Sequence, residues 1–231
     1  MVFNVNGNCG PTPTSTNTPV DTPTNTATNT ATATITATAT PPDTVCDLVE
    51  GFNDVTVLPG WEQNNNSDPI GAGTWFQGNP TVFPAHLPSP DPTPDQYIGV
   101  NFQSGTGVST LSNWLLTPPI TLQNGGQLTF YTRTGTANPF PARLQVRMST
   151  NGTSTDVGTA ATDLGDFTTL LLDINPTYIV GPTGYPEDWT LFTVTISGMG
   201  SPAKGRIAFR YFVENGGPGG ANSNYIGIDT F

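Results

Sequence analysis

The segment Arg206-Ile-Ala-Phe-Arg-Tyr-Phe-Val-Glu214 indicates the class of fold, because apolar side chains recur in it at every second position. Successive side chains of an extended strand point to opposite faces. One face of this segment, which we expect to meet the core, carries Ile207, Phe209, Tyr211 and Val213. Two further segments carry comparable rows, Leu128, Phe130 and Thr132 in one and Leu144, Val146 and Met148 in the other. The pattern predicts half-buried β-strands.

Turn residues separate many such segments along the chain. Its 231 residues include 26 Gly and 23 Pro, which disfavours long helices. We expect strands at Asp47–Phe52, Thr74–Gly78, Gln96–Phe102, Ser109–Leu122, Gln127–Arg133, Arg143–Ser149, Phe167–Ile174, Trp189–Ser197, Arg206–Glu214 and Tyr225–Phe231. The predicted fold is therefore all-β, an antiparallel two-sheet jelly-roll sandwich over residues 46–231.

Residues 1–45 have a different composition and are predicted to form an extended Thr-, Pro- and Ala-rich arm. From Thr12 to Thr40 every even position is Thr except Val20. A period of two places Thr on one side of an extended chain, and Pro with β-branching excludes a helix. Two interpretations remain open, a disordered mucin-like stalk and an ordered arm that pairs with a sheet edge of another copy.

The ordered interpretation predicts self-assembly. An extended arm has to satisfy its backbone hydrogen bonds, and an exposed sheet edge on a neighbouring copy is the simplest partner. Identical head-to-tail contacts of this kind do not close and therefore build a filament. The apolar and small residues that we expect to insert are Val2, Phe3, Val5, Ala31, Ala33, Ile35 and Ala37.

The two cysteines, Cys9 and Cys46, bracket the arm. If the arm is extended, they lie beyond the roughly 7 Å within which two Cα atoms can be bridged. A disulfide between Cys9 of one copy and Cys46 of another fits a filament. Two unpaired thiols are the alternative, which is unusual in an oxidising compartment.

Charge excludes several classes of function. The chain has 17 acidic and 6 basic residues, a net charge of −11 at pH 7. A phosphate-binding surface needs clustered Lys and Arg, so we expect no nucleic-acid partner. No apolar run approaches the roughly 20 residues that span a bilayer. Low charge, abundant Thr and Asn and the two cysteines instead suggest an extracellular or cell-surface protein, although the first residues show no targeting signal.

Several short motifs carry a family resemblance. In order they are Glu50-Gly-Phe52, Leu58-Pro-Gly-Trp61, Thr74-Trp75, Asn113-Trp-Leu-Leu-Thr-Pro-Pro-Ile120, Asp188-Trp189, Gly205-Arg-Ile-Ala-Phe-Arg210 and Tyr225-Ile-Gly-Ile-Asp229. Together they resemble the choice-of-anchor J, or cleaved-adhesin, group of bacterial surface domains, which are MAM-like jelly rolls. The most specific part is the block Asn113–Ile120. The resemblance implies an extracellular adhesive or structural module rather than an enzyme.

The resemblance also implies a structural calcium ion where the first and last strands meet. The matching oxygen-bearing residues are Glu50, Asn53, Asp54 and Asp229. The alternative is that Glu50 and Asp54 are ordinary solvated residues. We expect no required cofactor.

Catalysis has little support in the sequence. The one histidine, His86, lies in a Pro-rich segment, and no nucleophile–base signature accompanies it. A sugar-binding platform is a further alternative, although the residues concerned fit a core position better. These residues are Trp61, Trp75, Trp114 and Trp189.

Glycans are expected on the chain itself. Asn65 and Asn151 are the two Asn-x-Ser/Thr acceptors. The Thr row of the arm is a natural O-glycan track, with Thr28, Thr32 and Thr36 as candidates, and a bare Thr row is the alternative.

Two functions follow from these observations. The first is a structural subunit of an extracellular pilus-like filament, which polymerises by inserting its N-terminal arm into neighbouring jelly rolls. The alternative is a monomeric carbohydrate- or host-binding adhesin domain on a flexible Thr/Pro stalk.

Overall fold

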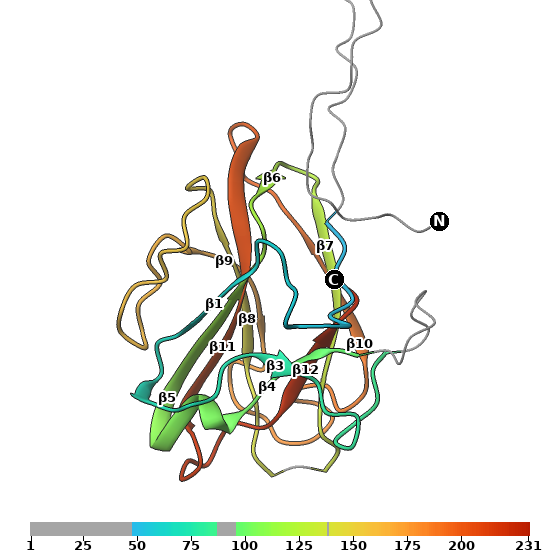
Figure 1. The fold of residues 1–231 in the computed structure, drawn as a ribbon, viewed down its shortest axis with the longest axis vertical. Helices are drawn as coiled ribbons and strands as arrows, with labels where there is room; N and C mark the ends of the chain where they lie inside the picture. The colour runs from blue at the N-terminus through green and yellow to red at the C-terminus, as the bar shows by residue number, and fades with distance from the viewer. Residues whose placement is uncertain (1–47, 87–95, 138) are drawn as a thin grey trace, which may run out of the picture.

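The computed structural model describes residues 48–86, 96–137 and 139–231 (Figure 1). The predicted arm over residues 1–45 lies outside the described residues. The same holds for its insertion residues, for Cys9 and Cys46, and for the three threonine candidates. The division of the chain at residue 46 and the disulfide therefore stay predictions.

The described part folds as two antiparallel sheets, so the predicted all-β sandwich is confirmed. The larger sheet has the strand order β1-β5-β11-β8-β9, with β2 paired to β5 and β6 paired to β11. Its strands are β1 (Glu62–Asn65), β2 (Asp68–Ile70), β5 (Gly105–Leu116), β6 (Ile120–Leu122), β8 (Leu144–Ser149), β9 (Thr169–Ile174) and β11 (Ala203–Gly216). The long strands β5 and β11 lie side by side in Figure 1.

The smaller sheet has the order β10-β7-β12-β4-β3. Its strands are β3 (Phe76–Gln77), β4 (Ile98–Val100), β7 (Gln127–Thr134), β10 (Thr190–Thr195) and β12 (Ile226–Asp229). A single turn of 3-10 helix, Phe102–Ser104, lies between β4 and β5. Within the described ranges no helix is long or apolar enough to cross a membrane.

The main core fills the space between the two sheets and uses the predicted inner rows. The rows of β7, β8 and β11 are buried, with the aromatic ring centres of Phe130 and Phe209 4.9 Å apart in an edge-to-face contact between the sheets. The other face of β11 is buried as well at Ala208 and Arg210. This strand is therefore covered on both sides, which the alternation of its sequence did not predict.

Strand boundaries differ from the prediction where proline or polar residues intervene. The predicted strand Ser109–Leu122 is two strands, because Pro118 and Pro119 have no N–H to continue the ladder. The polar strands β1 and β2 were not predicted, since their sequences lack apolar alternation. The first expected strand is reduced to a backbone pair, in which Glu50 and Phe231 exchange two 2.9 Å hydrogen bonds.

Candidate ligand-binding site

The outer face of the larger sheet is closed by a long loop that arginines hold in place. The guanidinium of Arg210 donates to the backbone carbonyls of Ala161 and Asp163. Arg147 donates to the carbonyls of Phe167 and Thr168 at 3.3 and 3.4 Å. Residues 150–168 are thereby fixed over this face. Because planar guanidinium groups donate along several directions, one buried Arg satisfies several loop carbonyls.

These arginines do not form a basic docking surface. Arg147, Arg206 and Arg210 are all buried, and burial together with the nearby Arg147 and Arg143 lowers the pKa of Arg210 to about 9. Arg210 therefore stays charged at neutral pH. Arg143 pairs with Asp173 through hydrogen bonds of 2.8 and 2.6 Å. The cations of this face are engaged within the fold.

A second small core covers the outer face of the smaller sheet. Phe83 stacks on Tyr97 with ring centres 5.0 Å apart, and the guanidinium carbon of Arg133 lies 4.6 Å from the centre of the Phe83 ring. The indole N–H of Trp189 donates to the carbonyl of Pro84 at 2.9 Å. Residues 79–86 thus lie against the sheet, and His86 stacks on Tyr131 rather than standing in an exposed loop.

Two glycines make this aromatic layer fit. A Cβ on Gly227 would come within 2.7 Å of the Tyr97 ring, and a Cβ on Gly99 within 2.7 Å of the Tyr225 hydroxyl. The rings therefore lie directly on the backbone of β4 and β12. Such close approach is open only to glycine.

The tryptophans do not form a sugar-binding platform. Trp61, Trp75 and Trp114 are buried, which confirms the core interpretation, and Trp189 is half-buried in the small aromatic core. A flat stacking surface needs exposed aromatic faces, which these side chains do not offer.

The calcium candidates take part in hydrogen bonds within the fold. Glu50 accepts from the N–H of Phe52, Asp54 from Thr56, and Asn53 from the N–H of Gln96. Asp229 is buried and accepts from the N–H groups of His86 and Thr230. Across the described residues no three His, Cys, Asp or Glu side chains are arranged to hold a metal. Burial raises the pKa of Glu50. Calcium stays a prediction.

The two N-glycan candidates have different environments. The amide nitrogen of Asn65 donates to the carbonyls of Gly73 and Ser104 at 2.9 and 2.8 Å. Asn151 is exposed, and its amide donates to Asp166 at 2.8 Å. Of the two, Asn151 is the more accessible acceptor.

Loops cover part of each outer face, and at one end of the sandwich further loops form the candidate contact surface. Here three loops meet, and the described residues of these loops are 135–137 with 139–143, 175–189 and 217–225. The N–H of Ser223 donates to the carbonyl of Pro141 at 2.8 Å, and the Asn175 amide donates to that of Ala142 at 2.9 Å. These bonds join the three loops into one surface.

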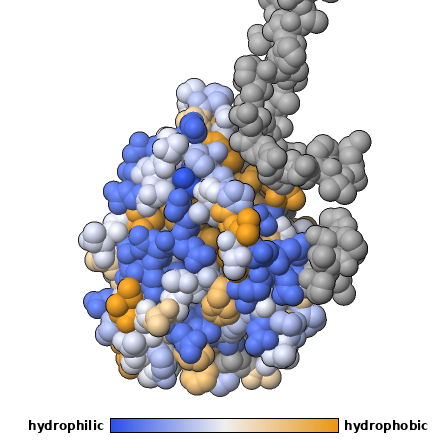
Figure 2. All heavy atoms as spheres, in the orientation of Figure 1, coloured by the Kyte–Doolittle hydropathy of each residue, from blue (hydrophilic) through white to orange (hydrophobic). Residues whose placement is uncertain are grey.

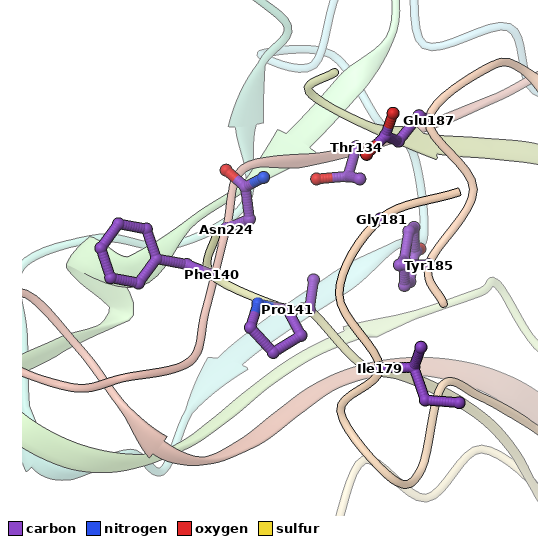
Figure 3. Close-up of a pocket in the computed structure, with 9 residues that line it drawn as sticks. Thr134, Phe140, Pro141, Ile179, Gly181, Tyr185, Glu187 and Asn224 are labelled. Atoms are coloured by element: carbon purple, nitrogen blue, oxygen red, sulfur yellow. The ribbon is translucent and has the colours of Figure 1, made fainter. Parts of the chain in front are cut away.

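A small pocket of about 10 Å³, room for about one water molecule, opens between these loops (Figure 3). Its lining includes Thr134, Phe140, Ile179, Tyr185, Glu187 and Asn224. Figure 3 shows the Asn224 amide between Phe140 and Thr134. Two apolar residues of the lining are well exposed, Phe140 at 46% and Ile179 at 48%, and Val180, which follows Ile179 in the chain, is 52% exposed. The face drawn in Figure 2 is by contrast mainly hydrophilic, with apolar spots scattered among polar residues.

Asn224 is the polar group that distinguishes this pocket. The residue is only 7% exposed, and its side-chain oxygen accepts from the N–H of Tyr225 at 2.7 Å. That bond distinguishes the oxygen of the side-chain amide from its nitrogen. The amide nitrogen is buried and has no hydrogen-bond partner in the protein. The pocket therefore contains an unused donor.

Sequence reasoning missed this site. Phe140 stands between two prolines in a predicted turn, and an aromatic residue in such a position is the signal that could have indicated exposure. Nothing in the Gly- and Asn-rich stretch around Asn224 indicates which amide is buried, since that depends on loops distant in sequence.

These features define a jelly-roll sandwich whose outer faces are partly covered by loops and whose end carries a candidate contact surface. The solved structures that it resembles are adhesin domains. The K1 cleaved adhesin domain of Lys-gingipain from Porphyromonas gingivalis W83 is 25% identical, with a TM-score of 0.52 over 79% of this chain and 94% of that domain. The K2 cleaved adhesin domain of Lys-gingipain is 20% identical, with a TM-score of 0.51 over 80% and 97%.

More distant likenesses extend to carbohydrate-binding modules of the β-sandwich superfamily, at 13% identity and a TM-score of 0.39 over 81% of this chain and 62% of that one. No protein-family model matches the chain, and a search of curated proteins found no match. The adhesin-like jelly-roll fold is thus shown, whereas membership of the choice-of-anchor J group stays a prediction.

Proposed function

We propose that this chain is an extracellular, non-catalytic binding protein of the adhesin type, and that it contacts its target through the loop end of the sandwich. The observation that carries the proposal is the exposure of the apolar side chains Phe140, Ile179 and Val180 on the loops at this end, two of which line the pocket. Exposed apolar clusters of this kind mark interaction sites. The likeness to the K1 adhesin domain supports the same class of function.

Bead adhesion tests this proposal. Beads coated with the full chain are counted on surfaces of immobilised mucin, collagen and fibrinogen. We expect retention on at least one surface, and the double substitution Phe140→Ser with Ile179→Ser lowers it at least tenfold. Val57→Ser is the matched control, because Val57 is 68% exposed and does not line the pocket. Equal retention of all variants, or none by the unmodified chain, contradicts the proposal.

A second candidate function is head-to-tail polymerisation through the N-terminal arm. A specific feature favours it on the acceptor side, since the consecutive strands β9 and β10 are the terminal strands of the two sheets. They carry exposed apolar residues, Leu170 at 46% and Leu191 at 50%. An uncovered apolar edge of this kind can accept an additional strand from another chain.

Electron microscopy tests polymerisation. The full chain is expected to form fibres, and a chain that lacks residues 1–40 is expected to stay monomeric. Leu170→Lys and Leu191→Lys should shorten or abolish the fibres, because charged side chains protect sheet edges from pairing. Fibres that persist after deletion of residues 1–40 show that the arm is not the connector.

A further inference from the structure

We propose that the loop end of the sandwich docks a basic segment of another protein, one that carries apolar side chains among its lysines and arginines. This inference rests on the proposed binding function and names the kind of partner. It joins three features of this end of the molecule: exposed apolar side chains, acidic side chains beside them, and cations that the fold itself already engages.

Acidic side chains border the exposed apolar surface. Glu187 lines the same pocket as Ile179, and the next residue, Asp188, has a side chain that is 98% exposed. On β11 the N–H of Glu214 donates to the hydroxyl of Tyr178 at 2.9 Å, which places Glu214 next to the loop that carries Ile179. The side chain of Glu214 is 59% exposed. A partner that packs on this apolar surface therefore meets carboxylates at its border.

The cations of this end offset these carboxylates only weakly. The guanidinium of Arg133 lies 4.0 Å from the Asp188 carboxylate, but it donates to a backbone carbonyl and its side chain is only 12% exposed. Arg143 lies 3.8 Å from the Glu214 carboxylate, yet it already pairs with Asp173 through two hydrogen bonds. Ion pairs with a well-exposed partner are weak in water, so both carboxylates can still attract an external cation.

The charge of this end also differs from that of the opposite end. All six Lys and Arg residues lie in the described ranges, and Lys204 alone is exposed, whereas the arginines are buried or half-buried. Lys204 pairs with Thr121 of β6, and β6 lies at the other end of the sandwich from residues 139–143 (Figure 1). Complementary charge steers a basic partner toward the loop end and speeds its association.

The two features together select a polypeptide partner. Acidic groups alone attract any cation, but the exposed side chains of Phe140, Ile179 and Val180 also require apolar groups against them. A segment that intersperses lysine or arginine with leucine or phenylalanine supplies both within a few residues. Lysine and arginine carry their charge at the end of a long apolar stem, so they can meet the bordering carboxylates while an adjacent side chain packs on Phe140.

Fluorescence anisotropy with the full chain tests this inference. The probes are three matched short peptides with a neutral dye: one intersperses lysine with leucine, one replaces each lysine by glutamate, and one replaces each leucine by serine. We expect the lysine–leucine peptide to bind at least tenfold more tightly than the other two. Raising NaCl from about 50 to about 500 mM should weaken its binding, because salt screens exposed charges.

Two pairs of substitutions with the same change of net charge locate the binding. Asp188→Asn with Glu214→Gln removes two charges at the loop end and should weaken binding about fivefold, as expected when two exposed ion pairs are lost. The control pair, Glu62→Gln with Asp156→Asn, removes two exposed charges elsewhere and should leave binding within about twofold. Phe140→Ser, at an exposed apolar side chain, should weaken it about tenfold.

The outcomes separate the alternatives. Selective binding of the lysine–leucine peptide that the loop-end variants weaken and the control pair preserves supports the inference. Binding of the glutamate or serine peptide with equal affinity, equal losses from both pairs of substitutions, or no binding of any peptide overturns it. In the bead assay, retention that depends on Phe140 and Ile179 but not on Asp188, Glu214 or salt leaves the proposed function standing and rejects a basic partner.

Discussion

The guanidinium carbon of Arg210 lies 4.6 Å from the centre of the Trp114 ring, and both side chains are buried on the outer face of the larger sheet. Arg210 on β11 pairs in register with Trp114 on β5. The contact thus stacks a cation on an indole where alternation alone predicts solvent-facing side chains. It also directs the guanidinium toward the carbonyls of residues 150–168, so one residue joins the sheet to its covering loop.

Arg210→Lys is expected to destabilise the fold by about 2–4 kcal/mol. A lysine keeps the charge but loses the planar group that donates to Ser112, Ala161 and Asp163, and it leaves buried acceptors without partners. Urea unfolding followed by tryptophan fluorescence measures the change. Lys204→Met at an exposed position is the control and should stay within about 0.5 kcal/mol. An equally small effect of Arg210→Lys would show that the loop is held by other contacts.

Gly227→Ala is expected to lower the free energy of unfolding by about 1–3 kcal/mol, because the new methyl group overlaps the Tyr97 ring. The small aromatic core should loosen with it, which near-ultraviolet circular dichroism reports. Gly200→Ala is the control, since a Cβ there meets nothing within 4 Å. Unchanged stability in both variants would mean that the aromatic layer shifts without cost.

The covering loop is expected to loosen in acid through Asp163. Hydrogen bonds from the N–H groups of Ala160 and Thr159 lower the pKa of this exposed carboxylate below its ordinary value of 3.8. When folding lowers the pKa of an acid, its ionised form stabilises the fold. This contribution is complete above the pKa of the unfolded state and is lost as pH falls through the pKa of the folded state. Amide exchange at residues 159 and 160, corrected for the intrinsic rate, should therefore rise below about pH 4. In Asp163→Asn this extra acid dependence should disappear, and its persistence would assign the effect to another group.

For Glu50 we expect stability to change with pH in the opposite direction, and a variant at this position also tests whether calcium binds. Burial raises the pKa of Glu50, so its charged form is disfavoured in the folded state. The contribution of protonated Glu50 to stability is therefore present at low pH. It is lost as pH rises through the pKa of Glu50 in the unfolded state and then through its pKa in the folded state. Without calcium, Glu50→Gln should therefore raise the melting temperature slightly at pH 7. If calcium binds there, the unmodified chain should melt higher in calcium than in EDTA, and Glu50→Gln should remove that difference.

N-glycosylation should discriminate between the two acceptor sites. Expressed through a glycosylating secretory pathway, the chain is expected to carry glycan at Asn151, whose side chain is exposed, and much less at Asn65, whose amide nitrogen already serves two carbonyls. Peptide mass spectrometry before and after glycosidase treatment measures both occupancies. High occupancy at Asn65 would indicate modification before this part of the chain folds.

The inner rows of the strands were predictable because alternation is a local property. Phe130, Val146 and Phe209 face the core as their spacing indicates, since a strand with one buried face has no other register that buries them all. The strands β1 and β2 were not predictable in the same way. They are polar strands, and their pairing with β5 joins residues that lie 35 to 54 positions apart in the chain.

The candidate site was less predictable from the sequence than the strands were. Of the predicted calcium residues, Asp229 lies on β12 and Glu50 pairs with Phe231 just beyond it, as expected, and the side-chain oxygens of both accept from nearby N–H groups. Calcium binding there stays a prediction. The residues that line the pocket come from three loops, and none of them carries a motif. Their chemistry depends on which atoms remain unpaired after folding, and a linear pattern does not contain that information.

By itself, the sequence determined that this chain forms strands, which faces of β7, β8 and β11 meet the core between the sheets, and that its few cations give no nucleic-acid surface. Hydrophobic spacing and composition are enough for these conclusions, because they act within one strand or over the whole chain. The tertiary structure decided that Arg147 and Arg210 hold a loop, that Trp189 is covered, and that Asn224 is left with an unused donor. Each depends on groups distant in sequence that compete for the same hydrogen bonds and the same space, and that competition is resolved only when the sheets pack.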